Sequence, residues 1–268
     1  GTYRHHPVSL DHARLQAVDF MDTAILESWL QRLAPDAVIH TAALSQPNRC
    51  EQYPDLSYAV NVEATRILAQ YCSQRQIPLV FTSSDQVFDG RSAPYQETDP
   101  PQPINTYGRH KAEAERLIQA IHPTAAICRM PLMYGPPSPA AECFLQGFIR
   151  TLEAGQPLHL FTDEFRSPAY VEDAASGLLL VLEQQGTGIF HLGGPERLSR
   201  YDFGLLMTDI FDLDQTLIIP SQQADVAMAA ARPADVSSRG TRAYQLGYRP
   251  RSAVAGLRQT LAHALTAQ

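Results

Sequence analysis

The chain has 268 residues and a formal net charge of −7, which is enough length for one large domain, or a large and a small one, with a substantial core. No basic run accompanies this negative charge, and the most apolar run, Gly177 to Leu182, is far too short to span a bilayer. The four cysteines are widely spread without a Cys-x-x-Cys pair, and there is no signal-peptide pattern. We therefore expect a cytoplasmic protein with reduced thiols and with no nucleic acid, membrane or metal as a partner.

Predicted strands and helices follow one another along the chain. The first half predicts a strand at residues 15–20, a helix at 22–33, a strand at 36–43, a helix at 57–75, a strand at 78–82 and a helix at 107–121. The second half predicts strands at residues 125–129, 157–161 and 188–192, and helices at 143–152, 200–211, from 253 onward and in one segment that ends at Leu182. From Pro136 the segments are mixed and punctuated by proline and glycine, which indicates a second lobe.

The apolar run at residues 78–82 leads into a polar stretch, Ser83-Ser84-Asp85-Gln86. This pattern predicts a buried strand that opens into a polar loop at its carboxyl end. Ligands of open α/β sheets bind at the carboxyl ends of the strands. The loop is therefore the first place where we expect a binding site.

Tyr107 and Lys111 lie four residues apart on the next predicted helix and therefore share one face. Of the 21 basic residues, Lys111 is the only lysine. Lysine carries a compact point charge that can approach a phenol, whereas arginine carries a planar fork. We infer that this position requires an ammonium group; the alternative is a solvated residue on the helix surface.

These residues resemble the active site of the extended short-chain dehydrogenase/reductase superfamily. The stretches Ser83-Ser84-Asp85-Gln86-Val87-Phe88-Asp89-Gly90, Pro94-Tyr95-Gln96-Glu97 and Tyr107-Gly108-Arg109-His110-Lys111-Ala112-Glu113 are similar to the dTDP-4-dehydrorhamnose reductase family and its relative, the regulatory β subunit of methionine adenosyltransferase. The resemblance implies an α/β fold, with a Rossmann-type doubly wound parallel sheet and a smaller mixed α/β substrate lobe. It assigns residues 1–135 and 168–192 to the NADP-binding domain, and residues 136–167 and 193–268 to the substrate lobe.

The resemblance also implies roles for individual residues. Tyr107 would donate a proton to the substrate oxygen, with its pKa lowered from ~10 by the nearby Lys111, and Ser84 would orient that oxygen. The residues implied at the cofactor are Arg4, Asp19, Thr41, Ala42, Ala43, Asn61, Ser83, Tyr107, Lys111 and Leu132. The residues implied at the substrate are Ser84, Asp85, Gln86, Phe144 and Arg166. His40, in contrast, is interpreted as a histidine of the core, or one that supports the site residues, rather than as a catalytic residue.

The cofactor that the resemblance implies is NADP(H), with NAD(H) as the alternative. Arg4 follows the family's second strand, where a basic residue faces the 2′-phosphate of NADP and an NAD site usually has an acid. The sequence contains no Gly-x-x-Gly-x-x-Gly turn to hold the cofactor pyrophosphate. We expect this turn and the first strand upstream, in a longer natural chain. Without that strand the sheet would contain a gap with two exposed edges.

Position 86 helps to choose the reaction. Related 4,6-dehydratases carry Thr-Asp-Glu where this chain has Ser84-Asp85-Gln86, and the amide of Gln86 cannot abstract a proton. The resemblance therefore implies an NADPH-dependent reductase of a 4-keto nucleotide sugar. The alternatives are a non-catalytic NADP-binding regulatory subunit and a nucleotide-sugar epimerase. The oligomeric state stays open, with a homodimer as one alternative.

Overall fold

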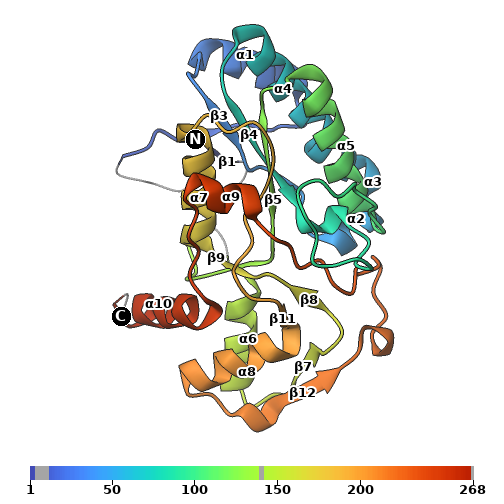
Figure 1. Ribbon diagram of the computed structural model, residues 1–268, viewed down its shortest axis with the longest axis vertical. Helices are drawn as coiled ribbons and strands as arrows, with labels where there is room; N and C mark the ends of the chain where they lie inside the picture. Colours follow the sequence, from blue (N-terminus) through green and yellow to red (C-terminus); the bar gives the residue numbers. More distant parts are fainter. Residues whose placement is uncertain (4–11, 139–141, 267–268) are drawn as a thin grey trace.

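The computed structural model describes residues 1–3, 12–138 and 142–266, with only the backbone for Thr266. Figure 1 shows two parts stacked along the long axis: an upper part built around a sheet with helices beside it, and a lower part that contains α6 and α8. No helix in the described ranges is long and apolar enough to cross a membrane.

A four-stranded parallel sheet forms the centre of the upper part. Its order is β10-β5-β4-β3, and Val80 of β4 lies beside Ala126 of β5. The strands are β3 (Val38–His40), β4 (Leu79–Ser84), β5 (Ala126–Met130) and β10 (Gly188–His191). Because all four strands are parallel, their carboxyl ends meet at one edge of the sheet, and the loops that follow them lie together.

Helices cover both faces of this sheet, which explains why its strands are apolar runs rather than alternating ones. One face is covered by α4 (Ala64–Arg75) and α5 (Thr106–Ile121), with a core of Ala69, Cys72, Leu79, Phe81, Ala114, Ile118, Ala125 and Ile127. The other face is covered by α7 (Val171–Glu183) and α9 (Thr241–Leu246), with a core that includes Val80, Cys128, Ala174, Val181, Phe190, Ala243 and Tyr248. The predicted α/β class with a Rossmann-type parallel sheet is confirmed.

The first two strands form a separate small sheet. β1 (Thr2–Tyr3) pairs in parallel with β2 (Gln16–Ala17), and this pair is not hydrogen-bonded to β3. Within the described ranges, β3 therefore ends the larger sheet on one side. The helix α1 (Thr23–Leu33) follows, and the carboxylate of Asp22 caps it by accepting a hydrogen bond from the backbone N–H of Ile25.

The long helix predicted at residues 57–75 is interrupted by a wider turn. After α2 (Pro47–Gln52), the chain forms α3 (Pro54–Tyr58), a π-helical turn at Ala59–Glu63 and then α4. Asn61 lies in the π-helical turn and is buried. Turns of this kind are frequently found at functional sites. This one directs the Asn61 side chain toward the loop that follows β3, which the simple helical pattern did not predict.

The lower part has its own apolar core. Its elements are α6 (Phe144–Glu153), β7 (Leu158–Phe161), β8 (Phe165–Arg166), β11 (Leu198–Ser199), α8 (Arg200–Phe211), β12 (Ile218–Ser221) and α10 (Ala253–Thr266). β7 pairs with β12 and β8 pairs with β11. β6 (Met133–Tyr134) and β9 (Ala169–Tyr170) pair in parallel where the chain passes between the two parts.

Part of the C-terminal region does not lie in the lobe to which the predicted domain division assigned it. Residues 193–268 were assigned to the substrate lobe, but Ala243 of α9 and Tyr248 pack in the core of the sheet. The Tyr248 hydroxyl donates a hydrogen bond to the backbone oxygen of Leu192 at 3.2 Å. The apolar face of this segment therefore completes the layer beside α7, and the rest of the division stays a prediction.

Candidate active site

The end of β4 and the start of α5 bring Ser84, Tyr107 and Lys111 together. All three are buried, with 6%, 8% and 1% of their surfaces exposed. Ser84 interacts with the Tyr107 hydroxyl as a hydrogen-bonding partner, and Lys111 Nζ lies 4.3 Å from the ring centroid of Phe81 on β4. Lys111 is therefore not a solvated residue of the helix surface.

A close backbone contact fixes the start of α5 against the turn after Ser84. The side-chain oxygen of Asn105 caps the helix by accepting the N–H of Gly108 at 2.8 Å, while its amide donates to Gln86 Oε1 at 2.8 Å. A β-carbon added to Gly108 would lie 2.1 Å from the backbone oxygen of Gln86. Only glycine permits this approach, and the Gln86 amide is held by the helix cap.

Substituting Gly108 with alanine is expected to lower the free energy of unfolding by about 1–3 kcal/mol, because the new methyl group overlaps backbone rather than a movable side chain. Chemical unfolding measures this change. The matched control is Gly147→Ala on α6, where a β-carbon would meet nothing within 4 Å, so helix propensity should leave stability equal or slightly higher. Equal stabilities of the two variants would contradict the proposed contact.

Burial sets the proton affinities of Tyr107 and Lys111. Desolvation raises the pKa of Tyr107 above its ordinary value, and the Ser84 interaction opposes only part of this effect. The prediction that Lys111 lowers the pKa of Tyr107 is therefore wrong for the protein without ligands. Burial of the phenol raises this pKa instead. Burial also lowers the pKa of Lys111 to about 7, against the attraction of Glu115. Within the described residues Lys111 Nζ has no hydrogen-bond partner.

A buried ion pair between Glu115 and Arg129 stabilises the elements that carry the site. Glu115 accepts hydrogen bonds from Arg129 Nε at 3.0 Å and Nη2 at 2.8 Å, and the two side chains are only 3% and 1% exposed. The Ser83 hydroxyl donates to the same carboxylate at 2.5 Å. Because Ser83, Glu115 and Arg129 lie on β4, α5 and β5, this network ties the three elements together. The Ser83 hydroxyl is held by Glu115, and its implied role at the cofactor stays a prediction.

Asn61 organises the loop that follows β3. Its side-chain oxygen accepts the N–H of Leu44 at 2.9 Å, and its amide donates to the backbone oxygen of Leu44 at 3.0 Å. Thr41, Ala42 and Ala43 directly precede Leu44 in this loop, with Thr41 exposed and the alanines half-buried. The implied cofactor residues 41–43 and Asn61 therefore belong to one braced segment at the carboxyl edge of the sheet.

His40 is a core residue, as predicted. It is 3% exposed, it shares a hydrogen bond of 3.0 Å with the Thr65 hydroxyl, and burial lowers its pKa to about 3. Its ring lies between those of Phe20 and Phe81, with centroids 5.9 and 5.6 Å away. A histidine held neutral in this way stabilises the sheet and does not transfer protons near neutral pH.

Two further implied cofactor residues, Asp19 and Leu132, lie in connecting segments. Asp19 lies in the turn between β2 and α1, where its carboxylate accepts the N–H of Met21 at 3.0 Å. Leu132 lies between β5 and β6, and its backbone oxygen accepts the N–H of Ala169 at 3.0 Å. Arg4 lies outside the described residues. The roles of all three at a cofactor stay predictions.

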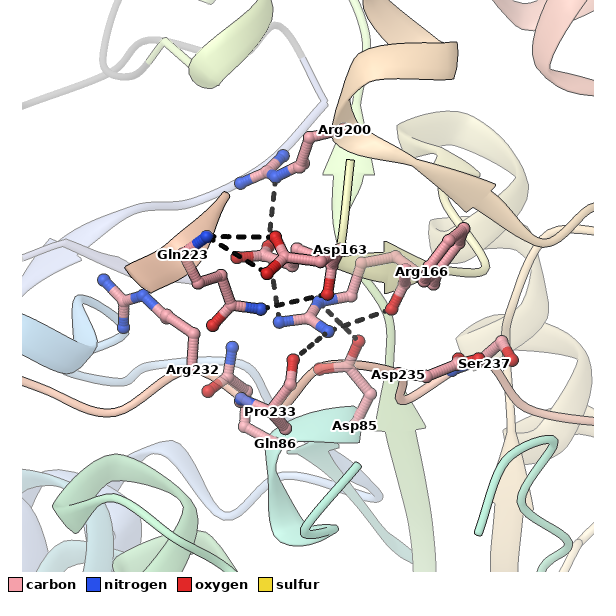
Figure 2. A network of polar contacts seen from close by, with 12 residues as sticks. Asp85, Gln86, Asp163, Arg166, Arg200, Gln223, Arg232, Pro233, Asp235 and Ser237 are labelled. Carbon is pink, nitrogen blue, oxygen red and sulfur yellow. Dashed lines mark hydrogen bonds and ion pairs between the residues drawn. The ribbon is translucent and has the colours of Figure 1, made fainter. Parts of the chain in front are cut away.

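Asp85 and Arg166, both implied at the substrate, meet in a network of buried charges (Figure 2). The Asp85 carboxylate lies 3.9 Å from Arg166 Nε, and Arg166 Nη2 lies 3.3 Å from Glu164. Arg166 Nη1 also donates to the backbone oxygen of Pro233 at 3.2 Å. Burial raises the pKa of Asp85 to about 6, although the charge of Arg166 opposes that change.

The segment 230–239 joins the upper and lower parts at this network. Its Ala231 oxygen accepts a hydrogen bond from Asn105 at 2.9 Å, and its Ala234 oxygen accepts the N–H of Phe165 on β8 at 2.7 Å. Ser238 forms a bridge with Tyr95, which belongs to the loop before α5. The site is therefore built from the sheet, the lower part and a late segment of the chain together.

Comparison with known proteins places this sequence in a family. The family described as "RmlD substrate binding domain" matches residues 4–265, which is nearly the whole chain. The chain belongs to the RmlD substrate-binding domain family.

Relatives of this RmlD-family chain carry two different descriptions. It is 34% identical over 236 residues to the "Probable low-salt glycan biosynthesis reductase Agl14" of Haloferax volcanii, a match that covers 87% of this chain and 78% of the relative. It is 29% identical over 255 residues to "Methionine adenosyltransferase 2 subunit beta" of Xenopus laevis, which covers 92% of this chain and 76% of the relative. One relative is thus described as an enzyme and the other as a subunit.

A solved structure shares the fold of this RmlD-family chain. The dTDP-4-dehydrorhamnose reductase of Bacillus anthracis, crystallised in complex with NADP, superposes with a TM-score of 0.87. The two chains are 23% identical, and the match covers 93% of this chain and 89% of that one. At this identity the likeness shows the common fold.

Phe144 belongs to an aromatic cluster of the lower part. It is the first residue of α6, and its ring lies 5.2 Å from that of Phe148 and 5.4 Å from that of Phe203. The guanidinium of Arg200 lies over it, 4.7 Å from the ring centroid. In this RmlD-family protein the Phe144 ring therefore supports Arg200, while its implied substrate contact stays a prediction.

Sequence analysis missed Glu164, Arg200 and Arg232, which the fold brings to Asp85 and Arg166. Glu164 lies 3.2 Å from Arg200 Nε, and Arg232 is held by the side chain of Asn48 at 3.1 Å. Nothing in the local pattern around Arg200 distinguishes it from an ordinary residue in the first turn of a helix.

Proposed function

We propose that this protein is an NADPH-dependent reductase of a 4-keto nucleotide sugar, of the dTDP-4-dehydrorhamnose reductase type. The observation that carries the proposal is the buried set of Ser84, Tyr107 and Lys111 at the carboxyl edge of the parallel sheet. The names of the Haloferax and Bacillus proteins, "Probable low-salt glycan biosynthesis reductase Agl14" and dTDP-4-dehydrorhamnose reductase, support the same reaction class.

The residues present fit the nicotinamide end of such a cofactor. Lys111 is a buried ammonium without a hydrogen-bond partner in the described part of the chain, so a bound ribose could supply the acceptors that it lacks. The loop 41–44, braced by Asn61, presents small side chains at the same edge. When bound, NADPH supplies the hydride, and NAD(H) is the alternative.

The protein side of the reaction is proton transfer and orientation. The Ser84 hydroxyl would bind the keto oxygen and turn it toward Tyr107. The raised pKa of Tyr107 keeps the phenol protonated, which is the form that can donate. Gln86 cannot abstract a proton, and its amide is engaged by Asn105, so water elimination lacks its base.

The direct test measures NADPH oxidation with a dTDP-4-keto-6-deoxy sugar, on the chain printed here and on any longer natural form of it. We expect oxidation that depends on the sugar and deuterium at the reduced carbon when the cofactor is labelled. A protein that binds NADPH and the sugar but transfers no deuterium would contradict the reductase assignment.

A second candidate is a non-catalytic regulatory subunit. The observation in its favour is the 29% identity to a methionine adenosyltransferase β subunit over 92% of this chain. The test adds the purified protein to a methionine adenosyltransferase catalytic subunit of the same organism. A stable complex with changed kinetics of that enzyme, combined with no keto-sugar reduction, would favour this candidate.

A further inference from the structure

His110 directly precedes Lys111 on α5, and the proposed reaction gives it no role. Its half-buried ring turns toward α3, which packs beside α5 (Figure 1). The Nδ1 atom lies 2.8 Å from the hydroxyl oxygen of Ser57, and the ring meets that of Tyr58 edge-on at a centroid distance of 5.5 Å. His110 therefore connects the helix of the proposed catalytic residues with α3.

Ser57 links this histidine to two further side chains. It is fully buried, with 0% of its surface exposed, and its oxygen accepts a hydrogen bond from the Asn61 amide at 3.1 Å. The thiol of Cys50 is a further hydrogen-bonding partner of Ser57. A serine hydroxyl can donate one hydrogen bond and accept two, so a change in any one of these bonds affects the others.

Asn61 and Cys50 together hold the backbone of Leu44. Asn61 accepts the Leu44 N–H at 2.9 Å and donates to the Leu44 oxygen at 3.0 Å, and the Cys50 thiol donates to the same oxygen at 3.2 Å. Leu44 ends the loop 41–44, whose other residues are implied at the cofactor. Within the described residues, a continuous path of hydrogen bonds thus runs from His110 to this loop.

The backbone of Leu44 fixes the direction of these hydrogen bonds. Its N–H can only donate and its oxygen can only accept, so the Asn61 amide has one orientation, with its nitrogen toward Ser57. The Ser57 oxygen accepts from Asn61 and keeps its own hydrogen for another partner. A neutral His110 can accept that hydrogen at Nδ1, whereas a protonated His110 donates to Ser57 and reverses the bond.

Charged groups from two helices act on His110: Arg109 and Glu113 from α5, and Glu51 from α2. Burial lowers the pKa of the histidine below its ordinary value, and Arg109 adds to this effect, while the two carboxylates oppose it. The group that packs against it from α3 is the ring of Tyr58, whose raised pKa keeps it neutral. The neutral histidine is therefore the form present at pH 7, and the charged form appears as the pH falls.

We propose that His110 is a positioning residue, which acts through Ser57 and Asn61 to hold the loop 41–44 in the geometry that binds the cofactor. This inference rests on the proposed function, since that function places the nicotinamide end of NADPH at this loop. With a neutral ring, the Ser57 hydrogen has its acceptor and the Asn61 amide is held. With a charged ring, the Ser57 hydrogen loses this acceptor, and the path that holds Leu44 is disturbed.

The link is tested first without any cofactor, by NMR. We expect the amide signal of Leu44 to shift as the pH falls and His110 becomes protonated, with a midpoint below the ordinary pKa of histidine. In Ser57→Ala the His110 ring still titrates, but the Leu44 signal should no longer follow it, because the connecting hydroxyl is absent. His110→Asn supplies an uncharged side-chain oxygen in place of Nδ1, so the Leu44 signal should stay constant over the same range.

The second test is NADPH binding to the full chain near neutral pH, by calorimetric titration. His110→Ala is expected to weaken binding by about 3- to 10-fold, because one hydrogen bond of the path is lost, and His110→Asn should restore the affinity. Where keto-sugar reduction is observed, the KM for NADPH should rise in His110→Ala by the same factor, while kcat stays nearly unchanged. The matched control is His159→Ala, which should bind like the unchanged protein because His159 is exposed on β7.

The outcomes separate this inference from the reductase assignment. A Leu44 signal that stays constant while His110 titrates overturns the inference, and so does an unchanged NADPH affinity in the folded His110→Ala variant. A Leu44 response that survives in Ser57→Ala also overturns it, since the effect would then reach the loop by another route. A protein that binds no NADPH in any form would end the reductase assignment, and the Leu44 signal would still decide whether His110 controls the loop. Thermal unfolding of each variant checks that it is folded.

Discussion

Replacing Tyr107 with phenylalanine is expected to lower the rate of keto-sugar reduction by about 100-fold or more, with cofactor and sugar affinity nearly unchanged. The substitution removes only the hydroxyl that interacts with Ser84 and keeps the buried ring. Without the phenol, no proton is delivered to the substrate oxygen, and the negative charge that develops on this oxygen during hydride transfer is not neutralised. Single-turnover reduction and separate binding titrations measure the two effects.

The control for this variant is Tyr58→Phe. Tyr58 is an exposed tyrosine of α3 whose hydroxyl donates to Glu113 at 3.2 Å, so its loss should leave the reduction rate at the level of the unchanged protein. Normal turnover in Tyr107→Phe would end the proposed proton-donor role. A rate that falls equally in both variants would point to a general effect on stability.

Replacing Lys111 with methionine is expected to stabilise the ligand-free protein, by on the order of a few kcal/mol at pH 7, while abolishing reduction. The lysine is 1% exposed, and burial lowers its pKa to about 7 from the 10.5 of the free side chain. The charged form of Lys111 is therefore less favourable in the folded protein than in the unfolded one, and this charge lowers the free energy of unfolding. Methionine fills a similar volume beside Phe81 without a charge.

The pH dependence of this stabilisation has a defined sign. Below about pH 7 the lysine is charged in both the folded and the unfolded protein, so the penalty is at its full size. As the pH rises toward 10.5, the unfolded state loses its proton as well and the penalty disappears. The difference in unfolding free energy between the variant and the unchanged protein should therefore narrow from pH 7 to pH 10. A methionine variant less stable than the unchanged protein at pH 7 would show that Lys111 is well compensated in the fold.

Features that depend on near neighbours in the sequence could be predicted. The helix that carries Tyr107 and Lys111 was predicted at residues 107–121, and it begins one residue earlier, at Thr106, and ends at Ile121. The strand before it ends at Ser84, two residues later than the predicted strand, which ended at residue 82. These elements follow from periodicity, caps and the switch from apolar to polar residues, which are all local properties.

Features that depend on burial or on distant segments could not be predicted. The pKa of Tyr107 was expected to fall because Lys111 is near in sequence, yet desolvation by the surrounding core raises it. Arg200 and Glu164 meet because α8 starts beside β8, and no local pattern encodes that contact. Asn61 was assigned to an ordinary helix, while the π-helical turn that aims it at Leu44 depends on the loop after β3.

The segment 230–239 has a consequence for how the protein is made. Asn105, Tyr95 and Phe165 all depend on it for backbone partners, although the ribosome synthesises it long after them. We expect a nascent chain that stops at residue 229 to leave Arg166 without the carbonyl of Pro233, and one face of the central sheet without α9 and Tyr248. The network around Arg166 would thus be completed only when the C-terminal residues have been synthesised, although Tyr107 and Lys111 are made much earlier.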